Sequence, residues 1–472
     1  MKNSKLLRVF LALSPEEIRR LDKFVRSPLH NRHKDVIRLF QYLRKHSGAG
    51  LVDLDKKHLF DYLFPGEAFQ MQKVHYVTSY LLRVIEDFLA WQEWDKDLTA
   101  RNIYLLRAYE KHQLDRAFLQ GLDRAFKQQS SQDLRNAHYH QQYYQLQYEK
   151  YKQTLTEGRM KQFNLQELVH SQDIAFISEK LKNACILLSH QTVVNQQYDT
   201  GLLHAVLDYL EQYPNWLTIP AIAVHYHAYR ALMDMENDQH FVEFKNLLLL
   251  HANRFNMAEL RDNFVMAINY CIRKANLGHA PYLKELFELY KSGLAIDVFL
   301  KNGILSRWTY NNIIIAGLNL QAYDWVHDFI YQYKERLAEK HQAGNFNFNL
   351  ARYHFEKREY NAAMSLLLQR EYDDLLHNLA AKTMLAKIYF RLEEEEALDH
   401  LLNSFRTYIY RKKVLGYHKE NYLNIINYIR KLSALMPGDK QQSQKLRSEV
   451  MATSILTEKN WLLEQIEAIT PN

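Results

Sequence analysis

Two stretches in the C-terminal part of the chain, NLARYHFEKREYNAAMSLLL (349–368) and MLAKIYFRLEEEEALDHLLNSF (384–405), share one pattern of apolar and small residues. Three pairs of matching positions are each separated by 35 residues: Leu350 with Leu385, Tyr360 with Glu395, and Ala363 with Leu398. Small residues at a fixed spacing let two antiparallel helices approach closely where they cross. Each stretch therefore predicts a pair of packed helices.

The first stretch resembles a tetratricopeptide unit. Leu350 and Ala351 stand at the close-packing positions of its first helix, and Tyr360 and Ala363 form the Y-x-x-A opening of its second. Weaker copies upstream begin at the aromatic residues 241, 282 and 323. The similarity to the tetratricopeptide-like superfamily covers about 310–410 and extends to about 200, although the usual Gly and Pro are missing. It implies a right-handed α-solenoid of antiparallel helix pairs.

Other stretches resemble a family of uncharacterised bacterial helical proteins: FVRSPLHNRH (24–33), LFPGEAF (63–69), IEDFLAWQEW (85–94) and WLLEQIEAI (461–469). With these stretches the resemblance covers nearly the full length. It implies an all-helical fold and no established activity.

Composition also favours helices. Of 472 residues, 47% are apolar and only 21 are Gly or Pro, which is too few for an all-β sandwich. All eight prolines fall where a helical pattern starts or breaks, and no alternating strand pattern is found. A capping box at Ser14 and Glu17 opens one helix, and further helices are expected at 34–46, 55–64 and 70–95. We predict an all-α protein with three parts: an N-terminal helical bundle (1–130), a repeat array (131–416) and capping helices (417–472).

The sequence favours a cytoplasmic protein. Arg8 interrupts the first apolar stretch, no cleavage site follows it, and no window offers about 18 uninterrupted apolar residues. Cys185 and Cys271 lie within apolar helical patterns and are too few for a disulfide framework or a zinc site. We therefore expect no export and no membrane span.

The stretch AHYHQQYYQLQYEKYK (137–152) holds five tyrosines. On a helix, one stripe contains Ala137, Gln141, Tyr144, Tyr148, Tyr151 and Leu155, and a second contains Tyr139, Tyr143 and Leu146. A platform for nucleic-acid bases would need more Lys or Arg beside the rings. The stretch therefore predicts a core helix packed on two sides.

No catalytic, metal-binding or cofactor-binding pattern is found. The sequence contains no H-E-x-x-H, no phosphate-binding Gly-rich motif and no G-x-S-x-G. The run Glu393–Glu396 stands where a second helix is expected to begin, where carboxylates favour the helix dipole. We expect a non-enzymatic protein without a cofactor.

Charge is uneven along the chain. Residues 1–50 hold 12 Lys and Arg against 4 Asp and Glu, residues 401–450 hold 10 against 3, and the remainder therefore has a net charge of −8. Eight cations form two candidate partner-binding patches: Arg19, Lys23 and Arg26, and Arg406, Arg411, Lys412, Lys413 and Lys419. They could hold phosphates or an acidic protein, or only solubilise the ends of the molecule.

A curved stack of helix pairs exposes a long groove that ordinarily holds a peptide or another protein. The first hypothesis is therefore a scaffold or adaptor that binds a protein or peptide. The alternative is a nucleic-acid or ribonucleoprotein-associated protein that uses the basic ends.

Overall fold

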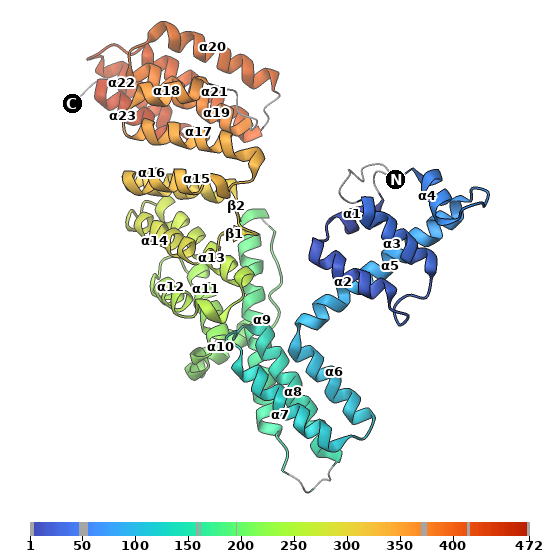
Figure 1. Cartoon of the computed structure of the whole chain (residues 1–472). Helices are drawn as coiled ribbons and strands as arrows, with labels where there is room; N and C mark the ends of the chain where they lie inside the picture. Colours follow the sequence, from blue (N-terminus) through green and yellow to red (C-terminus); the bar gives the residue numbers. More distant parts are fainter. Residues whose placement is uncertain are drawn as a thin grey trace. The chain divides into compact units, whose positions relative to one another are not determined.

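The structure, a computed structural model, describes residues 4–46, 55–156, 160, 162–194, 196–369, 375–412 and 416–469 (Figure 1). Within these ranges the chain forms 23 α-helices, three short 3-10 helices and one two-stranded hairpin. The all-α class predicted from the sequence is thus confirmed. The chain divides into two compact units: residues 1–183 with 202–222, and residues 184–201 with 223–472.

The first unit holds two helical cores. One is formed by α1 to α5 and the other by α6 to α8. The elements of this unit are α1 (Lys5–Leu11), α2 (Pro15–Arg26), α3 (Lys34–His46), α4 (Lys56–Leu63), α5 (Met71–Lys96), α6 (Leu98–Lys111), α7 (Asp115–Ser131), α8 (Ala137–Thr156), most of α9 (Leu165–Val194), α10 (Leu203–Gln212) and η1 (Pro214–Thr218). The three helices expected at 34–46, 55–64 and 70–95 are confirmed to within one residue at each end.

The capping box that opens α2 is also confirmed. The backbone N–H of Ser14 donates to the Glu17 carboxylate at 2.8 Å, and the N–H of Glu17 donates to the Ser14 hydroxyl at 3.2 Å. These hydrogen bonds hold the pKa of Glu17 below its ordinary value. Leu21, Phe24 and Val25 face the core.

The tyrosine-rich helix α8 buries one of its two expected stripes and leaves much of the other on the surface. Tyr139 and Leu146 are buried, but Tyr148 of the other predicted stripe is 43% exposed. The buried face is largely polar because α6 and the start of α7 supply partners for it. Gln142 donates to Asp97 at 2.9 Å, Arg107 donates to Glu149 at 2.7 Å, and Gln153 donates to Asp115 at 3.2 Å. The prediction of a helix packed through two apolar stripes was therefore wrong for the first stripe.

The second unit is a succession of helices in which sequence neighbours pack together, among them α13 with α14, α15 with α16, α17 with α18, and α19 with α20 (Figure 1). Its elements are the end of α9, α11 (Pro220–Met233, after Ile222), α12 (Gln239–Leu250), η2 (Ala252–Arg254), α13 (Met257–Asn276), α14 (Pro281–Ala295), β1 (Leu300–Lys301), β2 (Ile304–Leu305), α15 (Arg307–Asn319), α16 (Tyr323–Gln332), η3 (Lys334–Arg336), α17 (Glu339–Glu356), α18 (Tyr360–Leu368), α19 (Leu375–Arg391), α20 (Glu395–Arg411), α21 (Gly416–Ser433), α22 (Lys440–Ala452) and α23 (Lys459–Ile469).

The small residues singled out in the sequence lie at helix contacts. Ala351 on α17 and Ala363 on α18 are fully buried in one cluster with residues of α19, including Leu385 and Ile388. A larger side chain at either alanine would push these helices apart, since protein cores are packed as densely as organic crystals. Alternate helices also pack directly, α15 against α17 and α17 against α19.

One turn recurs between packed helices. The second residue after each helix has a positive φ. The N–H of the next residue donates to the carbonyl five residues before it, which satisfies a free helix carbonyl. The positive-φ residues of these turns are Gln113, Gly278, Gln321, Arg358 and Glu393. Only one of the five is glycine, although the left-handed region disfavours every residue that has a Cβ.

Replacing Arg358 with glycine should therefore raise the free energy of unfolding by about 0.5–1 kcal/mol, because its φ is +63°. Gly278→Ala, at φ +93° with nothing within 4 Å of the added Cβ, should lower it by a similar amount. Urea denaturation of the two variants measures both. A lower free energy of unfolding for Arg358→Gly would contradict this prediction, since it would show that contacts of the Arg358 side chain stabilise the protein more than the positive φ destabilises it.

A short hairpin interrupts the helices. Leu300–Lys301 pairs antiparallel with Ile304–Leu305 around Asn302 and Gly303, both of which have positive φ, as a tight I′ turn requires. Arg261 on α13 donates to the carbonyl oxygens of Val298 and Leu300 at 2.7 and 2.8 Å. No alternating strand pattern marks this hairpin in the sequence. Strands of two residues are too short to show an alternating pattern.

Candidate functional site

Two helices of the second unit present the same series of side chains outside the core. The positive-φ residue after α13 is Gly278, and the one after α15 is Gln321. The residues that stand 13, 9, 6 and 2 positions before these two turn residues are Val265, Asn269, Ile272 and Asn276 on α13, and Trp308, Asn312, Ile315 and Asn319 on α15. We call these two sets the open stripes. Val265, Trp308 and Ile315 are 42%, 53% and 39% exposed, Ile272 is half-buried, and the four asparagines are exposed.

The other faces of α13 and α15 are packed in the core, so the open stripes point away from it. Phe264 and Cys271 on α13, and Tyr310 and Ile314 on α15, are fully buried. The buried Tyr290 of α14 hydrogen bonds with the Asn312 side chain, and burial raises the pKa of this tyrosine to about 12. Both stripes therefore stand on rigid helices, which suits a surface that has to hold a partner in one geometry.

On α19 the position equivalent to Ile272 and Ile315 is not open, because the end of the chain lies against it. Lys387 of α19, six residues before its turn, forms an ion pair with Glu458 and lies 5.2 Å from the centre of the Trp461 ring on α23. The same ring packs edge-on against Phe390, with ring centres 5.7 Å apart. Leu462 and Ile466 of α23 are buried in the cluster that α19 shares.

Charges match across this contact. Arg352 is the equivalent of Lys387 on α17, and burial lowers its pKa to about 10, while Glu356 and Glu458 act in the opposite direction. The pKa of Glu356 is raised by burial, against the cations of Lys387 and Arg352. The chain thus covers its cationic positions with an acidic, aromatic segment.

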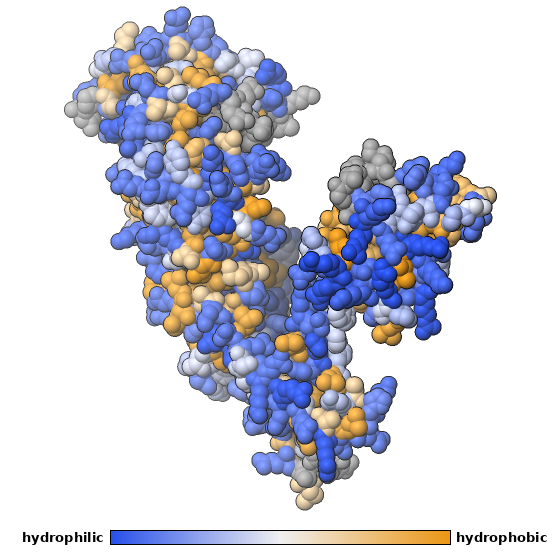
Figure 2. Space-filling model, in the orientation of Figure 1, coloured by the Kyte–Doolittle hydropathy of each residue, from blue (hydrophilic) through white to orange (hydrophobic). Residues whose placement is uncertain are grey.

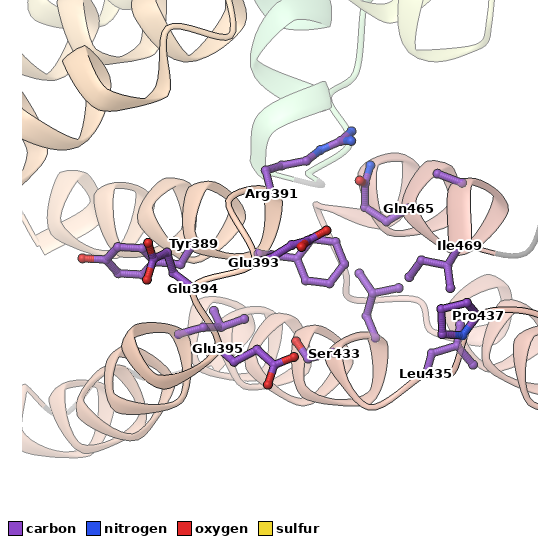
Figure 3. A pocket seen from close by; sticks show the side chains of 14 residues that line it. Tyr389, Arg391, Glu393, Glu394, Glu395, Ser433, Leu435, Pro437, Gln465 and Ile469 are labelled. Atoms are coloured by element: carbon purple, nitrogen blue, oxygen red, sulfur yellow. The ribbon is translucent and has the colours of Figure 1, made fainter.

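A pocket of about 370 Å³ opens beside the turn between α19 and α20. Figure 3 shows Glu393, Glu394 and Glu395 on one side of it and the apolar side chains of Leu435 and Ile469 on the other. The predicted helix start is confirmed, since α20 begins at Glu395 with two carboxylates in its first turn. This placement explains the acidic run by helix stability alone.

The predicted basic patch on α2 is exposed in the first unit. Arg19, Lys23 and Arg26 all lie on the surface. Arg26 forms an ion pair with Asp22 at 3.0 Å, whereas no carboxylate partner of Arg19 or Lys23 is found in the described part of the chain. An exposed pair of this kind contributes little to stability.

The second predicted patch lies around the end of α20 and the start of α21. Arg406, Arg411 and Lys412 are exposed, Lys419 is half-buried, and none of them reaches a carboxylate among the residues that the structure describes. Lys413 lies outside the described residues. Arg411, Lys412 and Lys382 each lie within 6 Å of the Tyr408 ring, and Lys419 lies 4.9 Å from the Tyr410 ring. Two tyrosines, Tyr410 and Tyr417, are about half exposed here.

The two cysteines and one pair of histidines are partly or fully buried. Burial raises the pKa of Cys185 and of Cys271 to about 12, which disfavours a nucleophilic thiolate. The ring nitrogens Nδ1 of His227 and His240 lie 3.0 Å apart, and burial lowers the pKa of both. Over the described ranges no group of three or more His, Cys, Asp or Glu could hold a metal ion.

The sequence reading missed the open stripes. The signal was present as V-x3-N-x2-I-x3-N (265–276) and W-x3-N-x2-I-x3-N (308–319), repeated after 43 residues. This repeated pattern is difficult to recognise in the sequence, because both helices are also apolar on their buried faces and asparagine is uncharged. Figure 2 shows further apolar side chains over α12 to α14, where Leu250 is 71% exposed.

No helix among the described residues is long and apolar enough to cross a membrane. No family model, no curated protein and no solved structure matches the chain.

Proposed function

We propose that this protein is a non-enzymatic scaffold or adaptor. In this proposal the second unit is a right-handed α-solenoid of tetratricopeptide-like antiparallel helix pairs, and the first helices of the pairs line a groove that binds a protein or peptide. The recurring turn and the direct packing of α15, α17 and α19 support such a stack.

The pair of open stripes is the observation that carries the proposal. A folded chain rarely exposes a tryptophan, an isoleucine and a valine, with a second isoleucine half-buried, at matched positions of two helices without a partner for them. Fully burying one such side chain contributes about 1.5–3 kcal/mol. The intervening asparagines can donate and accept hydrogen bonds at the edges of the apolar contacts.

Affinity capture from native lysate tests the proposal. The full-length chain should retain a partner protein with or without nuclease, and Ile315→Lys should lose it. Leu250→Lys, an equally drastic change of an exposed apolar side chain on α12, should retain it. The same protein recovered in equal amounts with Ile315→Lys would contradict a partner site at the open stripes.

Nucleic-acid association through the basic ends is the second candidate. It is favoured by the exposed Tyr410, whose ring lies 4.9 Å from Lys419, and by a second exposed tyrosine, Tyr417, at the start of the next helix. Base stacking on aromatic rings together with phosphate contacts is the usual way in which proteins bind single strands.

Binding of labelled oligouridine should then weaken about 50-fold between 50 and 200 mM salt, if four cations contact phosphates. Arg411→Glu with Lys412→Glu should abolish binding, whereas Lys440→Glu with Lys445→Glu, which changes the net charge equally, should reduce it only slightly. Equal binding by both double variants would remove this candidate.

A further inference from the structure

The chain shows what can cover the face of α19 that corresponds to the open stripes, because its own last helix lies there. The segment from Glu458 through α23 lies against Lys387 and Phe390, and its Trp461 ring is the central contact. A helix, rather than an extended segment, is therefore the element that fits these positions on α19.

The residue six positions before the turn differs between the helices: it is basic on α17 and α19 and apolar on α13 and α15. Where α17 and α19 carry Arg352 and Lys387, the open stripes carry Ile272 and Ile315. Glu458 suits both cations, because it pairs with Lys387 and its charge also acts on Arg352. A segment that covers the open stripes should instead present apolar side chains at the same places, since a carboxylate buried against isoleucine would have no partner.

The asparagines agree with a helical occupant. Within each stripe the two asparagines are seven residues apart, which is two helical turns or about 10.5 Å. A partner helix that runs along the stripe repeats its own side chains at this distance. Polar residues at i and i+7 then meet the asparagines, and apolar residues between them meet the isoleucine.

We propose that the open stripes of α13 and α15 bind an amphipathic helix of a partner protein, anchored by bulky apolar side chains and lacking acidic residues on its contacting face. This inference rests on the proposed function and specifies its partner. Trp308 and Ile315 are the main contacts, because a large exposed aromatic ring beside a branched aliphatic side chain is typical of interface hot spots.

A synthetic peptide derived from the chain's own last helix tests this inference. The probe is fluorescein-labelled peptide 457–469 with Glu458→Leu and Glu464→Leu, and the readout is fluorescence anisotropy with the full-length protein. We expect micromolar binding that weakens at least tenfold with Ile315→Lys or Trp308→Ala and less than twofold with Leu250→Lys. Lys387→Ala should leave binding unchanged, which separates the open stripes from the site of α23 itself.

A second peptide with Leu463→Pro in addition cannot form the helix. It should bind at least tenfold more weakly. Equal binding of both peptides, or no binding of either up to 200 μM, would overturn the helical occupant. If native-lysate capture still depended on Ile315 in those cases, the proposed function would stand with a different kind of partner.

Discussion

Replacing Gly317 with valine should lower the free energy of unfolding of the second unit by about 3 kcal/mol. A Cβ at this position of α15 would lie 2.4 Å from Cγ2 of Val326 on α16 and 3.0 Å from Cε2 of Phe287 on α14. Both neighbours are buried, so neither can swing into solvent. Three helices meet at this glycine, and the added side chain would force them apart. Chemical denaturation followed by circular dichroism measures the loss.

A rescue experiment separates this clash from a general effect on the helix. Val326→Ala removes the methyl group nearest to Gly317, so the double variant should recover at least 1 kcal/mol relative to the sum of the single changes. An exposed glycine within a helix behaves in the opposite way, since Gly→Ala then stabilises by about 1 kcal/mol. A Gly317→Ala protein that is more stable than wild type would rule out close packing of α14, α15 and α16.

The second large effect is expected in the first unit, where Glu149→Ala should lower the free energy of unfolding by about 2–3 kcal/mol. The Glu149 side chain is 1% exposed, accepts a hydrogen bond from Arg107 at 2.7 Å and forms an ion pair with Lys152 at 2.5 Å. Without it, two cations would face each other between α6 and α8. Both keep some contact with water, which keeps the effect below that of a fully buried pair.

Glu110 provides the matched control for this contact. It pairs with the same Lys152 at 3.0 Å but is about one-third exposed, so Glu110→Ala should reduce stability by less than 1 kcal/mol. Hydrogen exchange of the α8 amides should accelerate strongly in the Glu149 variant and little in the Glu110 variant. Equal effects of the two changes would show that burial of Glu149 does not matter.

Helix positions were predictable because their signals are local. Ser14 with Glu17 and the prolines mark helix starts or breaks, and these signals depend on neighbouring residues alone. The left-handed turns at Gln321, Arg358 and Glu393 were not predictable in this way, since none of these residues prefers positive φ. Packing of the two flanking helices imposes that conformation.

The buried face of α8 shows a second limit of sequence reading. Periodicity identifies apolar faces, but this helix buries Gln142, Glu149 and Gln153, whose partners lie 38 to 45 residues earlier. A polar residue is buried only if a partner reaches it, and that partner is set by tertiary structure. Tyr148, placed in the core by its spacing, is largely on the surface for the same reason.

Of the candidate sites, the basic patches could be found from charge alone and the open stripes could not. Exposure of Arg19, Lys23, Arg406 and Arg411 follows from the rule that unpaired cations stay in water. Recognising the open stripes requires knowledge of which apolar residues the core leaves out. Ile315 and the buried Ile314 are neighbours in the sequence, and only the fold distinguishes them.

Site-specific photo-crosslinking tests the central claim, that α13 and α15 hold a partner through the open stripes, most directly. A photo-reactive amino acid is placed at Ile315 in one full-length protein and at Leu250 in another, and both are irradiated in native lysate. The Ile315 protein should give a discrete adduct with a single partner protein, and the Leu250 protein should give none. No adduct at Ile315, or the same adducts from both proteins, would contradict the claim.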